Sequence, residues 1–275
     1  MSIFEIIKVI LIGIIQGITE WLPISSTGHM ILADEFISLG ISELFREVFL
    51  VVIQLGSIMA VVVLYFDRLN PFSMNKTSEE KRAAVTMWLK IAVACIPAAI
   101  IGVLFDDWID MLFYNYNTVA IMLMLYGALF IIVENANRNK EFKAESTNEL
   151  TYKMALIIGL FQVLALIPGT SRSGATVVGA MMIGVSRVAA AEFSFFLAIP
   201  VMFGASALKL VKYGFSFSGA ELIILAVGMI TAFLVSVVAI RFLLGYIKKN
   251  SFKAFGYYRV ALGAAVLLYF TLKHY

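Results

Sequence analysis

Long apolar runs separated by short charged stretches dominate the chain. Six of them are long enough to cross the hydrocarbon core of a bilayer as helices, at residues 48–66, 91–105, 118–133, 189–211, 221–242 and 257–272. Their apolar residues are continuous and do not alternate with polar ones, unlike the strands of a membrane β-barrel. We therefore predict an all-α polytopic integral membrane protein, with residues 1–275 forming a single membrane domain.

Two further apolar segments, residues 3–40 and 154–185, are interrupted by short polar stretches. The first is broken at Pro23 and at 25–28, and the second at 168–174. Proline and clustered serine or threonine disfavour the interior of a helix. We expect each segment to form a re-entrant helix–loop–helix hairpin, which enters the membrane and returns to the same side.

The order of these segments repeats along the chain. A hairpin and three spans occupy residues 1–133, and another hairpin and three spans occupy residues 154–275. An odd number of spans in each half places the second half upside down relative to the first. The pattern thus predicts an inverted repeat, whose two hairpins enter from opposite faces and meet near the middle of the bilayer.

The composition agrees with a membrane protein. Hydrophobic residues make up 61% of the chain and charged residues 14%, against about a quarter charged in soluble domains. The net charge of +3 is confined to loops, which argues against nucleic-acid binding. A single cysteine, Cys95, excludes an internal disulfide and a cysteine-based metal site. No basic run precedes the first apolar stretch, so we expect a retained first helix rather than a cleaved signal peptide.

Loop charge predicts the orientation. Lysine and arginine concentrate in the loops 67–90, 134–153 and 245–256, whereas 34–47 and 106–117 are rich in acids. Because basic loops stay on the cytoplasmic side, we expect both termini outside. The first hairpin then enters from outside and the second from the cytoplasm.

Each hairpin tip places the N-terminus of a half-helix at mid-membrane, where free N–H groups and the positive end of the helix dipole favour phosphate. Ser25 or Ser26 can cap the first half-helix, and Thr170 or Ser171 the second. Arg172 adds a forked cation that matches phosphate oxygens. We expect these tips to bind a phosphorylated group through Ser25, Thr27, Gly169, Thr170, Ser171 and Ser173.

The same tips carry groups suited to phosphoryl transfer. Gln16 and Glu20 share a helix face because they are four residues apart, and His29 lies one turn after Ser26. A serine could attack phosphorus, His29 or Glu20 could take its proton, and Arg172 would stabilise charge on the phosphate oxygens. We predict Glu20, Ser26, His29 and Arg172 as catalytic residues. Gln16 and Glu20 are alternatively ligands for Mg²⁺ or Ca²⁺.

Several motifs together carry a resemblance to a known family. They are QGITE and LPISSTGH in 16–29, VVIQLGS at 51–57, PGTSRSGAT at 168–176, and GVSR with FSF in 184–195. Through them, and over nearly its whole length, the sequence resembles the bacterial undecaprenyl-diphosphatases, also called the bacitracin-resistance protein family.

The resemblance implies a hydrolase of the bacterial plasma (inner) membrane. Such an enzyme removes the terminal phosphate of undecaprenyl diphosphate, recycles the carrier of cell-wall precursors and contributes to bacitracin resistance. The resemblance also implies two re-entrant hairpins, a site opening to the outer side, and Mg²⁺ or Ca²⁺. The family's serine pair, histidine and arginine fall on Ser25, Ser26, His29 and Arg172. Its first motif allows Glu or Gln at the first position, so Gln16 leaves Glu20 as the main acid. The nucleophile is either Ser26 or His29.

Two other functions stay open at this point. An isoprenoid-lipid transporter or flippase could use the same anion pocket, since inverted repeats with broken helices are typical of transporters, but transport does not need Ser26 with His29 and Glu20. A phosphatase of the type-2 phosphatidic-acid phosphatase class would carry Ser-Gly-His and Ser-Arg elements. Here Thr27 is inserted before Gly28, and no second catalytic histidine follows Arg172.

Overall fold

The computed structural model describes residues 2–214 and 216–273, apart from the side chains of Asp106, Asp107 and Asp110. Within these residues the regular structure is helical, accompanied by one isolated bridge between Ala144 and Val185. Six described helices are long and apolar enough to cross a membrane. They are α3 (Glu43–Leu64), α5 (Ser78–Phe113), α6 (Tyr116–Ala136), α9 (Arg187–Tyr213), α10 (Gly219–Ile247) and α11 (Lys253–Lys273). The predicted class, an all-α polytopic membrane protein, is confirmed.

The helix α5 is longer than the span expected at 91–105. After the short helix α4 (Phe66–Leu69), it begins inside the predicted loop 67–90 and continues to Phe113. A reciprocal cap explains the early start, since Thr77 Oγ1 accepts from Glu80 N at 3.2 Å and Glu80 Oε2 accepts from Thr77 N at 2.8 Å. The charged residues that follow are good helix formers, so this part of the expected loop is helical.

Two shorter helix pairs occupy the segments predicted as hairpins. In the first, α1 (Ile3–Thr19) connects to α2 (Ser26–Phe36) through residues 20–25, which we call the first tip. The second follows the 3-10 helix η1 (Thr147–Glu149). It runs from α7 (Tyr152–Val163) and the 3-10 helix η2 (Leu164–Leu166) through residues 167–171, the second tip, to α8 (Arg172–Met182).

Each hairpin packs against a span from the other half of the chain. A Cβ atom at Gly17 of α1 would lie 2.8 Å from Ala232 O of α10, and one at Gly159 of α7 would lie 2.2 Å from Ala94 O of α5. Glycine is needed at both contacts because the backbones approach too closely for any side chain. The two hairpins are thereby fixed to the long helices.

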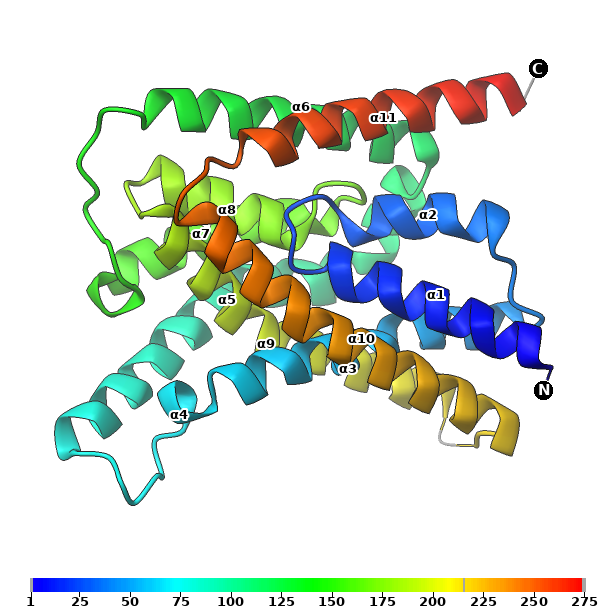
Figure 1. Ribbon diagram of the computed structural model, residues 1–275, viewed down its shortest axis with the longest axis horizontal. Helices are drawn as coiled ribbons and strands as arrows, with labels where there is room; N and C mark the ends of the chain where they lie inside the picture. Colours follow the sequence, from blue (N-terminus) through cyan, green and yellow to red (C-terminus); the bar gives the residue numbers. More distant parts are fainter. Residues whose placement is uncertain (1, 215, 274–275) are drawn as a thin grey trace.

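Figure 1 shows how the helices are arranged. The pair α6 and α11 run side by side along one edge of the molecule. The linkers α4–α5, α6–α7 and α10–α11 lie toward one end of the long axis, whereas α1 begins and α11 ends at the opposite end. The three linkers at the first end belong to the regions in which lysine and arginine concentrate.

Candidate active site

The two tips share one backbone geometry. Ser25 caps α2, with its Oγ accepting from Gly28 N at 3.3 Å, and Ser171 caps α8, with its Oγ accepting from Gly174 N at 3.1 Å. Both serines have positive φ, 72° and 71°, and among the described residues no other non-glycine residue does. This conformation costs about 1–2 kcal/mol for a residue with a Cβ atom. Backbone strain of this kind is typical of ligand-binding and active sites.

An ion pair joins the two hairpins, between Glu20 of the first tip and the first residue of α8. Arg172 Nη2 donates to Glu20 Oε1 at 3.1 Å, and Arg172 Nη1 donates to Ser194 O of α9 at 2.8 Å. The guanidinium also lies 5.9 Å from the ring centroid of Trp21. The two side chains are only 12% and 8% exposed, so each charge depends on the other for compensation.

Glu20 is the centre of a small hydrogen-bond network. Its Oε2 accepts from Gln16 Nε2 at 3.0 Å and from Ser26 Oγ at 3.2 Å. Gln16 and Glu20 therefore do meet, one turn apart at the end of α1. A carboxylate that accepts a hydrogen bond from a serine hydroxyl has the geometry of a general base beside a nucleophile.

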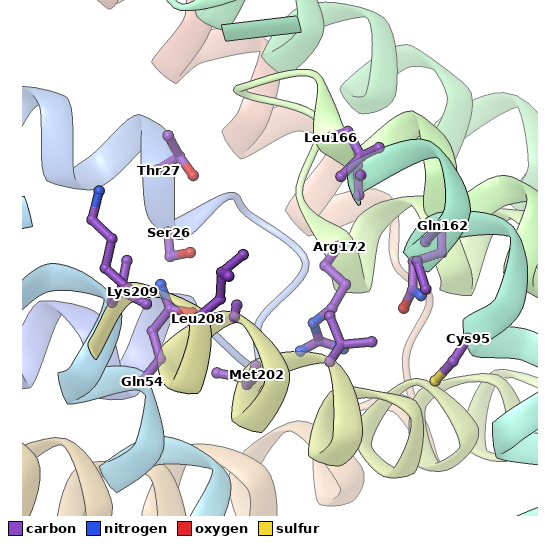
Figure 2. A pocket seen from close by; sticks show the side chains of 18 of the residues that line it. Ser26, Thr27, Gln54, Cys95, Gln162, Leu166, Arg172, Met202, Leu208 and Lys209 are labelled. Carbon is purple, nitrogen blue, oxygen red and sulfur yellow. The ribbon is translucent and has the colours of Figure 1, made fainter. Parts of the chain in front are cut away.

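A cavity of about 780 Å³ opens beside this network. Its wall includes Glu20, Ser26 and Arg172, together with three of the expected phosphate-binding residues, Thr27, Gly169 and Ser171. Figure 2 shows Ser26, Thr27, Gln54 and Lys209 on one side and Gln162 and Cys95 on the other, with Arg172 between them and Leu166 above it. Small and apolar residues of α5 and α9 complete the wall. The cavity can hold an anionic group and an attached apolar chain.

Other expected site residues do not line this cavity. Ser25 and Thr170 are buried within the tips. Ser173 Oγ lies 3.1 Å from Ser171 Oγ and donates to Glu20 O at 3.4 Å, so it bonds the second hairpin to the first. These residues shape the wall from within rather than present groups to its contents.

His29 also lies off the cavity wall. Its Nδ1 bonds Ser25 O at 2.8 Å, and its Nε2 bonds the Tyr258 hydroxyl at 2.7 Å. Because a carbonyl can only accept, Nδ1 carries the proton, and Nε2 of the neutral ring accepts from Tyr258. The two rings are stacked at 5.6 Å with an angle of 8° between their planes. Both nitrogens are thus occupied in holding the first tip.

The expected cation ligands fit a metal only in part. Among the described residues, no three His, Cys, Asp or Glu side chains come together as a metal site would require. Gln16 is buried, donates to Glu20 and does not line the cavity. Of the carboxylates whose side chains the structure describes, only Glu20 lines the cavity. That arrangement fits Mg²⁺ or Ca²⁺ only if substrate phosphate and water supply the remaining oxygen ligands.

One residue at the tips escaped the sequence interpretation. Arg259 of α11 is fully buried and donates to Pro23 O at 3.2 Å and to Gly169 O and Thr170 O at 2.9 Å each. The signal was present, since an arginine inside an apolar span is a candidate functional residue by default. The sequence could not predict which groups accept the hydrogen bonds that Arg259 donates.

Together these features define a class of protein. It is a multi-pass membrane protein with a buried serine–carboxylate–arginine set, which faces a cavity whose wall changes from polar to apolar. A family model described as "Bacitracin resistance protein BacA" matches residues 9–265. The chain belongs to this family.

Named relatives are similar over their full length. The chain is 65% identical to the undecaprenyl-diphosphatase of Acetivibrio thermocellus over 266 residues, covering 97% of this chain and 98% of the relative. It is 60% identical to that of Desulfitobacterium hafniense over 274 residues, covering 99% of each. It is 59% identical to undecaprenyl-diphosphatase 1 of Clostridium acetobutylicum over 273 residues, covering 99% of this chain and all of the relative.

Proposed function

We propose that this protein hydrolyses undecaprenyl diphosphate to undecaprenyl phosphate and inorganic phosphate. The activity named for its relatives supports this. The observation that carries it is the Ser26 hydroxyl, 3.2 Å from a Glu20 carboxylate that also pairs with Arg172, on the wall of one cavity. The reaction recycles the lipid carrier of cell-wall precursors and contributes to bacitracin resistance.

Ser26 is the nucleophile of the first step. Its Oγ attacks the terminal phosphorus while Glu20 takes the hydroxyl proton, and the bridging P–O bond breaks. Undecaprenyl phosphate leaves with the bridging oxygen and takes this proton from Glu20, which is ionised again. Arg172 stabilises the charge on the terminal phosphate oxygens. Ser26 is preferred over His29 because Ser26 lines the cavity and bonds Glu20, whereas both nitrogens of His29 are engaged.

Water completes the reaction in a second step. The water oxygen attacks the phosphoserine phosphorus while Glu20 takes a proton from the water. The P–Oγ bond breaks, inorganic phosphate leaves, and Glu20 returns the proton to Ser26 Oγ. Helix geometry leaves the first N–H groups of α2 and α8 without intrahelical acceptors. Those of Ser26, Thr27 and Arg172, three residues that line the cavity, therefore serve as donors toward phosphate oxygens.

A divalent cation would be held jointly by protein and substrate. Glu20 would supply one carboxylate oxygen to Mg²⁺ or Ca²⁺ and the diphosphate others, and Gln16 would orient Glu20 through its 3.0 Å bond. When bound, the ion neutralises part of the charge of the diphosphate.

The hairpins are re-entrant elements of an inverted repeat in the bacterial plasma membrane. The equal cap geometry of Ser25 and Ser171 supports the repeat. The gathering of the basic linkers at one end of the molecule supports a cytoplasmic position for that end (Figure 1). The site then opens to the outer side, and the apolar part of the cavity between α5 and α9 takes the isoprenoid chain.

The test is phosphate release from undecaprenyl diphosphate by the purified protein in detergent, with and without a chelator. Wild type should release phosphate, Ser26→Ala should release none above background, and the matched control Ser251→Ala should behave as wild type. A wild type that releases no phosphate would overturn the proposal. If Ser26→Ala stays active while His29→Ala is inactive, the nucleophile is His29. If the chelator leaves the activity unchanged, the reaction needs no divalent cation.

The hypothesis that the protein is a transporter has less support, because transport needs no hydrogen bond between Ser26 and Glu20. A headgroup carrier would use Arg172 and the two helix N-termini alone. Ser26→Ala would then retain lipid translocation at the wild-type rate in vesicles.

A further inference from the structure

Arg259 is a buried cation without a carboxylate partner in the described part of the chain. Its side chain is fully buried within α11, and the ion pairs among the described residues do not include it. A buried charge without a counter-ion is costly unless its hydrogen bonds are well satisfied. The guanidinium must therefore be compensated by neutral acceptors.

Those acceptors are backbone carbonyls of both tips. Arg259 Nη1 donates to Pro23 O of the first tip at 3.2 Å. Its Nη2 donates to Gly169 O and Thr170 O of the second tip at 2.9 Å each. These three carbonyls come from segments far apart in sequence, so one planar fork connects the two hairpins directly.

The base of the fork is anchored to α6. Arg259 Nε donates to Leu123 O and Nη2 to Met122 O, at 3.4 Å each, and the guanidinium lies 5.7 Å from the ring centroid of Tyr126. The helices α6 and α11 are in backbone contact here, since a Cβ atom at Gly127 would lie 2.7 Å from Gly256 O. The cation is thus fixed by the pair of helices that lie side by side along one edge (Figure 1).

The second tip rests on the same helix. A Cβ atom at Gly169, where φ is 90°, would lie 2.5 Å from Val119 O of α6. Both Arg259 and the second tip therefore contact α6. The first tip is connected to them through the hydrogen bond from Arg259 to Pro23 O. Carbonyls that would otherwise lack donors in an apolar environment are satisfied by Arg259.

We propose that Arg259 is a positioning residue, which holds the two tips at the separation at which Ser26 and Arg172 act on the same phosphate. This inference rests on the proposed function. Arg259 does not line the cavity, so it acts through the tips and not on the substrate. A lysine retains the charge but lacks the planar fork that reaches carbonyls of both tips at once.

The experiment combines turnover with a distance measurement that needs no substrate. Spin labels are attached at Phe36→Cys and Met182→Cys, exposed positions at the ends of α2 and α8, in a Cys95→Ser background. Arg259→Met and Arg259→Lys are compared with Arg241→Met, which removes an exposed arginine from α10. Phosphate release is measured on the same proteins without labels.

Arg259→Met should lower kcat about 100-fold, as expected for a misplacement of reacting groups by about 1 Å, with KM changed less than threefold, and should broaden the distance distribution. Arg259→Lys should broaden it too, and Arg241→Met should change neither property. Normal turnover in Arg259→Met, or reduced turnover with an unchanged distribution, would overturn the proposal. If Arg259→Met does not fold, Arg259→Lys is the test. Turnover and a distance distribution like those of wild type in Arg259→Lys would overturn the proposal. An inactive wild type would overturn the phosphatase function, while the distances would still test the role of Arg259.

Discussion

Arg172 Nη2 lies 3.1 Å from Glu20 Oε1, so a cation from the second hairpin neutralises the acid of the first. The same carboxylate accepts the Ser26 hydroxyl at 3.2 Å. The arginine that is proposed to bind substrate phosphate therefore also holds in place the carboxylate beside Ser26.

Breaking this pair should separate stability from activity. Glu20→Gln leaves Arg172 as an uncompensated buried charge, which should lower the free energy of unfolding by about 3 kcal/mol. The loss of the base should reduce phosphate release at least about 100-fold. The double variant Glu20→Gln/Arg172→Gln should regain most of the stability and none of the activity. Thermal unfolding in detergent and the phosphate assay measure the two effects, and simply additive losses of stability would contradict this account.

Removing the partner of His29 should have a modest effect. In Tyr258→Phe, His29 Nε2 loses the hydroxyl that lies 2.7 Å away, while the bond from Nδ1 to Ser25 O remains. Losing one hydrogen bond of about 1 kcal/mol should lower kcat roughly fivefold. The neighbouring Tyr257→Phe changes an exposed tyrosine and should match wild type. An inactive Tyr258→Phe enzyme would instead point to His29 as a residue of the chemical step.

The close contact between α3 and α10 should not tolerate a methyl group. A Cβ atom at Gly56 would lie 2.2 Å from Met229 O, so Gly56→Ala must force the backbones apart at a cost of about 2 kcal/mol. Gly245→Ala adds the same methyl group to α10 where nothing lies within 4 Å. It should be neutral or stabilising by up to about 1 kcal/mol, because alanine favours a helix more than glycine does. Gly56→Ala should therefore lower the melting temperature, whereas Gly245→Ala should leave it unchanged or raise it.

Lys209 should assist substrate binding from the rim of the cavity. It lines the cavity and donates to Glu47 at 2.6 Å. Lys209→Gln removes a positive charge and leaves Glu47 unpaired, which should raise KM about fivefold, equivalent to about 1 kcal/mol, with kcat unchanged. Added salt should shrink the difference. Lys248→Gln, an exposed lysine at the end of α10, serves as the control, and equal KM values for the two variants would argue against the assignment.

Features encoded locally could be predicted from the sequence. The long spans follow from unbroken apolar runs, and the tips follow from Pro23 and the serine-rich stretches. The early start of α5 was also within reach, because Thr77 and Glu80 have the spacing of a capping box. The prediction of a loop at 67–90 missed this capping box, because it gave the charge of these residues more weight than their helix propensity.

Features that depend on distant residues could not be predicted. Ser25, and not Ser26, caps α2 because Ser25 adopts a positive φ. That conformation could not be predicted from the residue type. The hydroxyl that occupies His29 comes from Tyr258, 229 residues away. The carbonyls that compensate Arg259 belong to both tips, and a backbone acceptor leaves no trace in a sequence. Residue type therefore selected the candidate catalytic set, but it could not predict which members line the cavity and which support the tips.

The serines with φ of 72° and 71° are each followed by the first residue of a helix, Ser26 in one case and Arg172 in the other. The same cap geometry is thus used twice, with a different residue after it each time. In the proposed mechanism, the first copy supplies the hydroxyl that reacts, and the second supplies the cation that holds the phosphate.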